Sequence, residues 1–190
     1  PHYPGIPSTL KPEDVRRLLM SVDRGNPNGK RDYAILLMVA RLGMRIKDIK
    51  EIKLNNLNWA TKSIDIVQHK TKQRTSYPIL DDIGWAIIDY LKNGRPKTES
   101  PHLFVRHNAP FEAFGTNANL YNIITKYTRL AGIKLRTGAS HGMHSLRHTL
   151  AGILLEQGTP LPVISEILGH MSTISTGIYL KIDYEGLLKC

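Results

Sequence analysis

The chain has 190 residues, of which 41% are hydrophobic and 22% charged, which is enough for one core and too little for two full-sized domains. Its 26 Lys and Arg oppose 16 Asp and Glu, for a formal charge of +10. This excess favours nucleic acid as a partner, although a basic surface can also serve solubility alone. Cys190 is the single cysteine and excludes an internal disulfide framework. No apolar run approaches the roughly 20 residues of a membrane span, so we expect a globular, cytoplasmic protein with no membrane partner.

The first third of the chain predicts a linker followed by three helices. Residues 1–8 are rich in proline and are expected to be the linker, and Pro12-Glu13-Asp14 then marks the start of a helix to about Val22. Beyond a turn-rich stretch at 25–29, apolar residues at helical spacing predict a second, buried helix that Gly43 interrupts. A third helix follows from about residue 46 to 56. Three lysines are expected on its outer face: Lys47, Lys50 and Lys53.

The middle of the chain changes to an alternating pattern. Between residues 63 and 80 this alternation predicts a β-hairpin with a basic turn at 70–74. Asp81 is expected to cap a helix that runs to about Leu91, and residues 103–105 are expected to form a short strand. Residues 117–130 predict another amphipathic helix. Gly132 is expected to end that helix.

The last third holds several polar, reactive side chains on amphipathic helices. A helix is predicted over 144–157, with His144 and Arg147 on a face beside its core stripe. The stripe consists of Leu146, Leu150, Ile153 and Leu154. A further helix is predicted from Thr159 to Gly169, directly before His170. The fold class expected is therefore α+β, mainly α-helical, with a small antiparallel sheet.

Cutting a DNA phosphodiester without a metal requires a nucleophile, cations on the non-bridging oxygens and an acid for the leaving oxygen. Arginine suits phosphate because its planar fork donates two hydrogen bonds and stays charged. Arg45 and Arg147 are the candidates for that role. Lysine and histidine can move protons where the site sets a suitable pKa. Tyr179 could supply the attacking oxygen.

Each of these residues also has an ordinary structural interpretation, and none is decisive alone. Arg45 and Asp48 lie three apart, as in a surface helical pair. Lys70 and Lys72 could be solvated charges in a turn. Tyr179 could be an amphipathic surface or interface residue.

Three histidines raise the alternative of a metal site. His144 and His148 lie four apart on a predicted helix, and His170 could be a third ligand. The zincin motif, however, needs Glu directly after the first His, where this chain has Ser145, and Arg147 between the histidines would repel a cation. These residues do not favour a metal.

Five separated segments combine into one larger pattern. Arg45 has an acidic residue, Asp48, three positions later, and a lysine lies in the predicted hairpin. His144-Ser-Leu-Arg147-His-Thr follows, and then Leu-Gly-His170 precedes Tyr179 by nine residues. With this combination, residues 9–185 resemble the catalytic domain of the tyrosine recombinases, the phage-integrase family.

Two departures and one ambiguity accompany the resemblance. Asp48 stands where many members have glutamate, and Met44 stands where leucine is usual. Lys70 and Lys72 both match the family's hairpin lysine. Pro78 lies eight residues after Lys70, which favours Lys70 and leaves Lys72 in reserve.

The resemblance implies a site-specific recombinase or integrase of a mobile element that breaks and rejoins double-stranded DNA. Tyr179 would attack the scissile phosphate, leaving a 3′-phosphotyrosyl bond and a free 5′-hydroxyl. Arg45 and Arg147 would hold the non-bridging oxygens as charge builds in the transition state. Lys70 would protonate the leaving oxygen.

The resemblance also implies supporting roles. His144 would assist proton transfer, His170 would hydrogen-bond the phosphate, and Asp48 would support the geometry of the arginines and histidines. No metal or cofactor would be needed.

The implied domain organisation is a catalytic domain at 9–183, a linker at 1–8 from an upstream DNA-binding domain, and a tail at 184–190 that docks onto a neighbouring subunit. The resemblance implies a tetramer on paired DNA sites. Three alternatives remain: a type IB topoisomerase-like or telomere-resolving enzyme with the same active site, a non-catalytic DNA-binding module, and a metal-dependent nuclease built on His144, His148 and His170.

Overall fold

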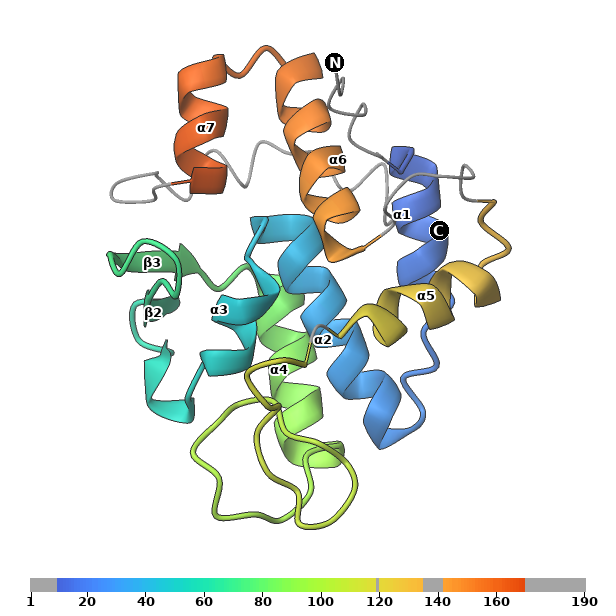
Figure 1. Ribbon diagram of the computed structural model, residues 1–190, viewed down its shortest axis with the longest axis vertical. Coiled ribbons are helices and arrows are strands. Elements are labelled where there is room, and N and C mark those ends of the chain that lie inside the picture. Colours follow the sequence, from blue (N-terminus) through green and yellow to red (C-terminus); the bar gives the residue numbers. More distant parts are fainter. Residues whose placement is uncertain (1–9, 119, 135–141, 170–190) are drawn as a thin grey trace.

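The computed structural model describes residues 10–118, 120–134 and 142–169 (Figure 1). The helices are α1 (Pro12–Met20), α2 (Pro27–Leu42), α3 (Ile46–Glu51), α4 (Asp81–Asn93), α5 (Tyr121–Leu130), α6 (Met143–Glu156) and α7 (Leu161–Gly169), with a short 3₁₀ helix, η1, at Leu54–Asn56. The strands β1 (Leu57–Asn58), β2 (Ser63–Val67) and β3 (Arg74–Pro78) form an antiparallel sheet in the order β1-β2-β3. The expected fold class, α+β and mainly helical, is confirmed.

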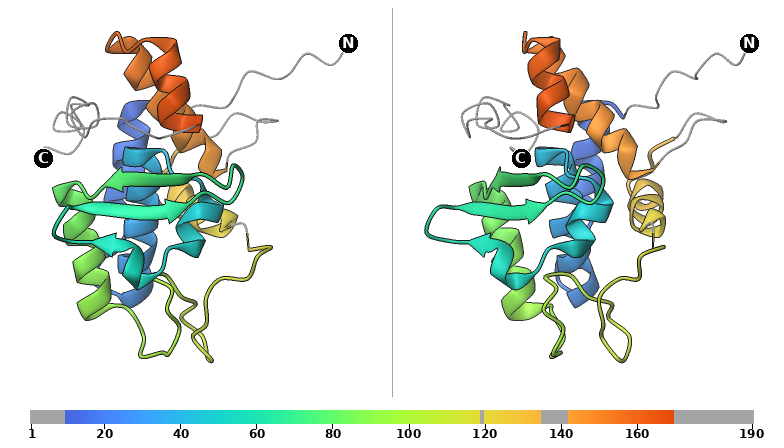
Figure 2. Two further views of the ribbon diagram at one scale, coloured as in Figure 1. Left: turned by 90° about the vertical axis from the view of Figure 1, so that its left-hand side faces the viewer. Right: turned by 60° about the vertical axis from the view of Figure 1, so that its left-hand side comes forward.

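Helix α2 is the centre of the core. Every residue from Ala34 to Ala40 on this helix is buried, and burying each large apolar side chain contributes about 1.5–3 kcal/mol. Helices α4 and α6 pack directly against α2, and α1 also contacts it. The sheet lies alongside α3 and α4, and α6 and α7 form a helical pair at one end of the molecule (Figures 1 and 2). The core therefore holds the helices that carry the predicted site in a fixed relation.

Helix α2 begins inside the stretch that was predicted to be a turn. Its N-cap is Asn26, whose Oδ1 accepts a hydrogen bond of 2.8 Å from the N–H of Gly29, and Pro27 occupies the first helical position. A capping side chain followed by proline starts a helix even where asparagine and glycine are frequent. The predicted start after residue 29 is wrong for this reason.

Lys50 corrects the prediction of an outward-facing lysine row on α3. The residue is only 3% exposed, and its Nζ donates hydrogen bonds to the carbonyl oxygens of Gly115, Thr116 and Ala118 at 2.9, 2.9 and 2.6 Å. Burial lowers the pKa of the Lys50 ammonium. The carbonyls replace its water shell, which makes this burial tolerable, and they attach the segment before α5 to α3.

The predicted hairpin at 63–80 is confirmed. Ile64 pairs with Tyr77 and Ile66 with Thr75, which places the two isoleucines on the buried face. Strand β1 was not predicted, because two residues are too few to show an alternation.

Three further predictions for the middle of the chain are wrong. Residues 103–105 form no strand, and isolated bridges join Lys53 to His102 and Val105 to Ala113 instead. Asp81 is the first residue of α4, whose N-cap is Leu80, with no side-chain cap bond. Helix α5 begins at Tyr121 and not near residue 117.

Helix α6 buries the predicted stripe of Leu146, Leu150, Ile153 and Leu154. It packs against α2 on one side and α7 on another. In the described part of the chain, no helix has both the length and the apolar character that crossing a membrane requires. The predicted linker at 1–8 and tail at 184–190 lie outside the described residues.

Candidate active site

The two arginines of the sequence pattern meet at one backbone oxygen. Arg45 is the N-cap of α3 and Arg147 lies on α6. Arg45 Nη2 donates to the carbonyl oxygen of Leu168 at 3.2 Å, and Arg147 Nη2 donates to the same oxygen at 2.7 Å. Both arginines are partly buried. Residues about 100 positions apart in the sequence thus direct their guanidinium groups at a single acceptor near the end of α7.

Gly43 allows this close approach. It ends α2 with a φ of 62°, a left-handed conformation that suits glycine. A Cβ atom at this position would lie 2.7 Å from Cδ2 of Leu168 and 3.1 Å from Cδ2 of Leu150. The carbonyl of Gly43 also accepts a hydrogen bond from Nη1 of Arg147. The end of α2 therefore touches both α6 and α7 at the point where the arginines meet.

Asp48 attaches α3 to the hairpin. It is 2% exposed, and its Oδ1 accepts a hydrogen bond of 2.7 Å from the backbone N–H of His69, next to Lys70. Its other oxygen, Oδ2, is buried and has no hydrogen-bond partner among the described residues. Asp48 was expected to support the arginines and histidines, whereas its described hydrogen bond supports the turn that carries Lys70.

Gln68 belongs to the site although the sequence analysis did not select it. Its side chain is buried, and Oε1 accepts from Nη1 of Arg45 at 3.4 Å and from Oγ1 of Thr71 at 2.8 Å. Its Nε2 donates to the hydroxyl of Tyr77 at 3.3 Å. A signal was available, because Gln68 continues the inward positions of Ile64 and Ile66 with a polar residue.

Tyr77 lies close enough to this cluster for its charges to act on the phenol. Burial is the main cause that raises the pKa of Tyr77, and the nearby Asp48 carboxylate raises it further. The positive charges of Arg147 and Arg45 act in the opposite direction. Tyr77 therefore stays a neutral hydroxyl that accepts the hydrogen bond from Gln68.

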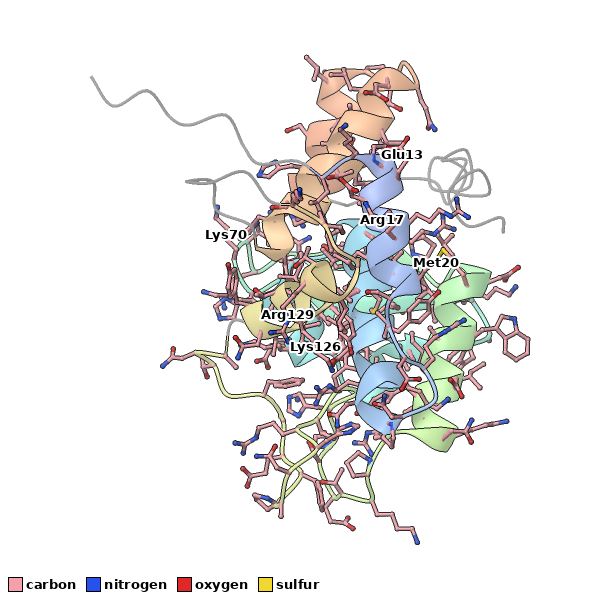
Figure 3. The ribbon with its side chains drawn as sticks, turned by 90° about the vertical axis from the view of Figure 1, so that its right-hand side faces the viewer. Glu13, Arg17, Met20, Lys70, Lys126 and Arg129 are labelled. Carbon is pink, nitrogen blue, oxygen red and sulfur yellow. The ribbon has the colours of Figure 1, made fainter. Side chains whose placement is uncertain are left out.

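The two hairpin lysines face different surroundings. The turn is closed by hydrogen bonds of 2.9 Å from Gln68 N–H to the Gln73 carbonyl and from Lys72 N–H to the Gln68 carbonyl. Lys72 adopts a φ of 58° and lines a cavity of about 320 Å³ with Glu51 and other residues. Lys70 is exposed and lies at the margin of the molecule in Figure 3. Lys72 thus shares its cavity with the acidic Glu51. Lys70 lies between His69 and Thr71, which are held by hydrogen bonds to Asp48 and Gln68.

His144 lies in the first turn of α6, three residues before Arg147. It is exposed overall, yet partial burial of its ring is the first cause that lowers its pKa, followed by the charges of Arg147, His148 and Arg45. A neutral imidazole is able to accept a proton. His144 therefore stands beside the arginine pair in the form that a proton acceptor needs.

His148 lines another cavity, of about 220 Å³, together with Leu10 and Pro12. Among the described residues, no three His, Cys, Asp or Glu side chains are grouped as a metal would require. His170 and Tyr179 lie outside the described residues, so the three-histidine alternative and the nucleophile stay predictions. Helix α7 carries the chain to Leu168 and Gly169, the two residues before His170.

A model of the phage integrase family matches residues 8–185. The chain belongs to the phage integrase family. Among curated members, protein y4gC of Sinorhizobium fredii, whose name assigns it to the integrases and recombinases, is 37% identical over 96% of this chain and 93% of y4gC. The tyrosine recombinase XerA of Pyrococcus furiosus is 29% identical over 96% of this chain and 60% of XerA. The chain thus spans nearly all of one relative and about three fifths of the other.

Solved structures of recombinases share the fold. A crystal structure of XerA recombinase matches with a TM-score of 0.71 and 25% identity, covering 94% of this chain and 61% of that one. XerH site-specific recombinase, bound to a palindromic difH substrate after cleavage, matches with a TM-score of 0.70 and 22% identity over 95% of this chain and 51% of that one. The resemblance to the tyrosine recombinases expected from the sequence is confirmed, and the XerH likeness supports the fold alone.

Proposed function

We propose that this chain is a tyrosine recombinase that cuts and rejoins double-stranded DNA through a covalent bond to Tyr179. The observation that carries the proposal is the convergence of Arg45 and Arg147 on the carbonyl oxygen of Leu168. One oxygen that accepts from two guanidinium groups marks a point where a non-bridging phosphate oxygen would be held by the same donors.

The chemistry proposed for this site is a transesterification. The Oη of Tyr179 forms a bond to phosphorus while the bond from phosphorus to the 5′ oxygen breaks. The phenolic proton passes to a base, for which His144 is the candidate, and the 5′ oxygen takes a proton from the ammonium of Lys70. One phosphodiester is exchanged for another, so the bond energy is kept for rejoining. Two arginines that stabilise the charge on the phosphorane are worth several kcal/mol, on the order of 3 kcal/mol for one donor.

The remaining roles follow from position. Asp48 fixes the turn that holds Lys70 through the N–H of His69. Because His170 follows the end of α7, it is proposed to donate a further hydrogen bond to the phosphate. The charge of +10 favours a DNA partner through the release of condensed counterions. Tetramer assembly on paired sites stays a prediction.

The test is a trapping experiment on nicked DNA. The chain is mixed at low ionic strength, with a chelator present, with a randomised pool of labelled duplexes. Each duplex carries a nick, so that cleavage releases the cleaved end. The products are separated on a denaturing gel. The parent is expected to give a detergent-resistant adduct that Tyr179→Phe lacks, while Tyr121→Phe, a matched change on the surface of α5, keeps it. An adduct from Tyr179→Phe, or none from the parent, would contradict the proposal.

The recovered DNA supplies a defined substrate for a second measurement. Exchange of flanking DNA between two recovered sites is the product expected of a recombinase. Relaxation of supercoiled DNA without exchange, or hairpin ends, would instead favour the topoisomerase-like or telomere-resolving alternative.

A further inference from the structure

We propose that Gln68 is a positioning residue that couples Arg45 to the turn carrying Lys70, so that the phosphate clamp and the proton donor keep a fixed relation. This inference rests on the proposed function, because it assigns Gln68 a task in that same reaction. Gln68 itself is buried, with 1% of its surface exposed, and therefore acts only through its neighbours.

The carboxamide of Gln68 bonds in three directions. Its oxygen accepts from Arg45 and from the hydroxyl of Thr71, and its nitrogen donates to Tyr77. These partners belong to the N-terminus of α3, the turn and strand β3. One small planar group therefore connects three segments, one of which is the turn that carries the candidate acid.

The two residues that flank Lys70 are both held by hydrogen bonds. The N–H of His69, just before it, is held by Asp48 at 2.7 Å, and the hydroxyl of Thr71, just after it, is held by Gln68 at 2.8 Å. Asp48 and Arg45 lie within one turn of each other at the start of α3. The backbone of Lys70 is thereby tied to α3 on both sides, while its side chain is exposed.

A purely structural role does not account for a glutamine at this position. The preceding inward residues of the hairpin, Ile64 and Ile66, are apolar, and another apolar side chain would fill the same face with no polar group to desolvate. Burying a carboxamide costs free energy that its hydrogen bonds return only in part. The polar residue is explained by what it holds, which is the guanidinium of Arg45 and the turn.

The consequence for the reaction is geometric. Displacement of a reacting group by about 1 Å is able to lower a rate on the order of 100-fold. Gln68→Leu keeps a side chain of similar volume and removes both the acceptor oxygen and the donor nitrogen of the carboxamide. It is expected to slow adduct formation about 10- to 100-fold by letting the turn move away from Arg45. Gln68→Glu keeps an acceptor for Arg45 and Thr71 and should recover part of this loss.

A sulfur substitution at the 5′ bridging position of the recovered DNA isolates the part of the rate loss that acts through Lys70. A thiolate leaves without needing a proton because thiols ionise far more readily than alcohols. Lys70→Ala and Gln68→Leu should both be slow on the oxygen substrate and both recover on the sulfur substrate. Recovery by Lys70→Ala alone, or a parent-like rate for Gln68→Leu on oxygen, would overturn the proposal.

A measurement without DNA separates this inference from the proposed function. Hydrogen exchange at the amides of residues 69–72 should be faster in Gln68→Leu than in the parent. Gln157→Leu, the same chemical change at the exposed end of α6, should leave these amides unchanged. If no variant forms an adduct but the turn amides respond, the recombinase assignment fails and the coupling by Gln68 stands; unchanged amides in Gln68→Leu would overturn the coupling itself.

Discussion

Arg147 donates a hydrogen bond to the backbone carbonyl of Gly43, which lies two residues before Arg45. One arginine of the candidate clamp therefore holds the backbone that leads into the other. The left-handed conformation of Gly43 turns its carbonyl toward α6 and starts the chain toward α3. The geometry of the pair thus depends on a residue that touches no substrate.

Gly43→Ala is expected to reduce both stability and activity. The substitution places a side chain at a φ of 62°, with its Cβ 2.7 Å from Leu168, and should lower the free energy of unfolding by about 1–3 kcal/mol. Urea unfolding measures this loss. Gly152→Ala is the matched control, because a Cβ there meets nothing within 4 Å and should stabilise α6 by about 0.5–1 kcal/mol. Equal behaviour of the two variants would argue against the close approach at Gly43.

Arg147→Lys should lose activity although it keeps the charge. A single ammonium cannot reproduce the fork by which Arg147 contacts the carbonyls of Gly43 and Leu168 together. We expect adduct formation to slow about 100-fold or more, measured in single turnovers. Arg129→Lys, on the outer side of α5 in Figure 3, should stay near the parent rate. A near-parent rate for Arg147→Lys would show that charge alone suffices.

His144 predicts how activity and stability respond to acid. Partial burial and the charges of Arg147, His148 and Arg45 lower its pKa below 6.5. Between the folded and unfolded pKa values the unfolded chain binds more protons, so the contribution of His144 to stability is complete above 6.5 and is lost as the pH falls through the folded pKa. The acid limb of adduct formation at low DNA concentration should have its midpoint below 6.5. An imidazole titration by NMR with a midpoint above that value would contradict this.

Lys50→Met should destabilise the fold through the segment before α5. The substitution removes the ammonium donor from the carbonyls of Gly115, Thr116 and Ala118, at a cost of about 2–4 kcal/mol in the free energy of unfolding. Lys47→Met, on the same helix but exposed, is the control and should change stability by less than about 0.5 kcal/mol. Urea unfolding of both variants tests the difference. A Lys50→Met chain as stable as the parent would mean that the three bonds contribute no net stability.

Much of the architecture could be predicted because periodicity reflects burial. The repeated spacing in α2 and α6 and the alternation at Ile64 and Ile66 identified the elements that form the core and the hairpin. The start of α2 was missed because asparagine, proline and glycine serve both turns and helix caps. Lys50 was misplaced because the helical pattern places a residue on a face but does not reveal a carbonyl cage formed by a segment 65 or more residues away.

The sequence named candidate residues for the site, and it revealed neither Gln68 nor the contacts that join these residues. Arg45, Asp48, Lys70, His144 and Arg147 were all selected from the sequence. The meeting point at Leu168 and the coupling by Gln68 depend on tertiary contacts between α3, α6, α7 and the hairpin. No spacing rule along one chain records such contacts.

The central claim is that Tyr179 becomes covalently bonded to the 3′ phosphate of cleaved DNA, and mapping the trapped adduct tests it most directly. The adduct is digested with nuclease and protease, and the modified peptide is sequenced by mass spectrometry. The account predicts a peptide whose Tyr179 carries a nucleotide through a 3′-phosphodiester. A nucleotide on another residue, or one attached through a 5′ phosphate, would contradict it.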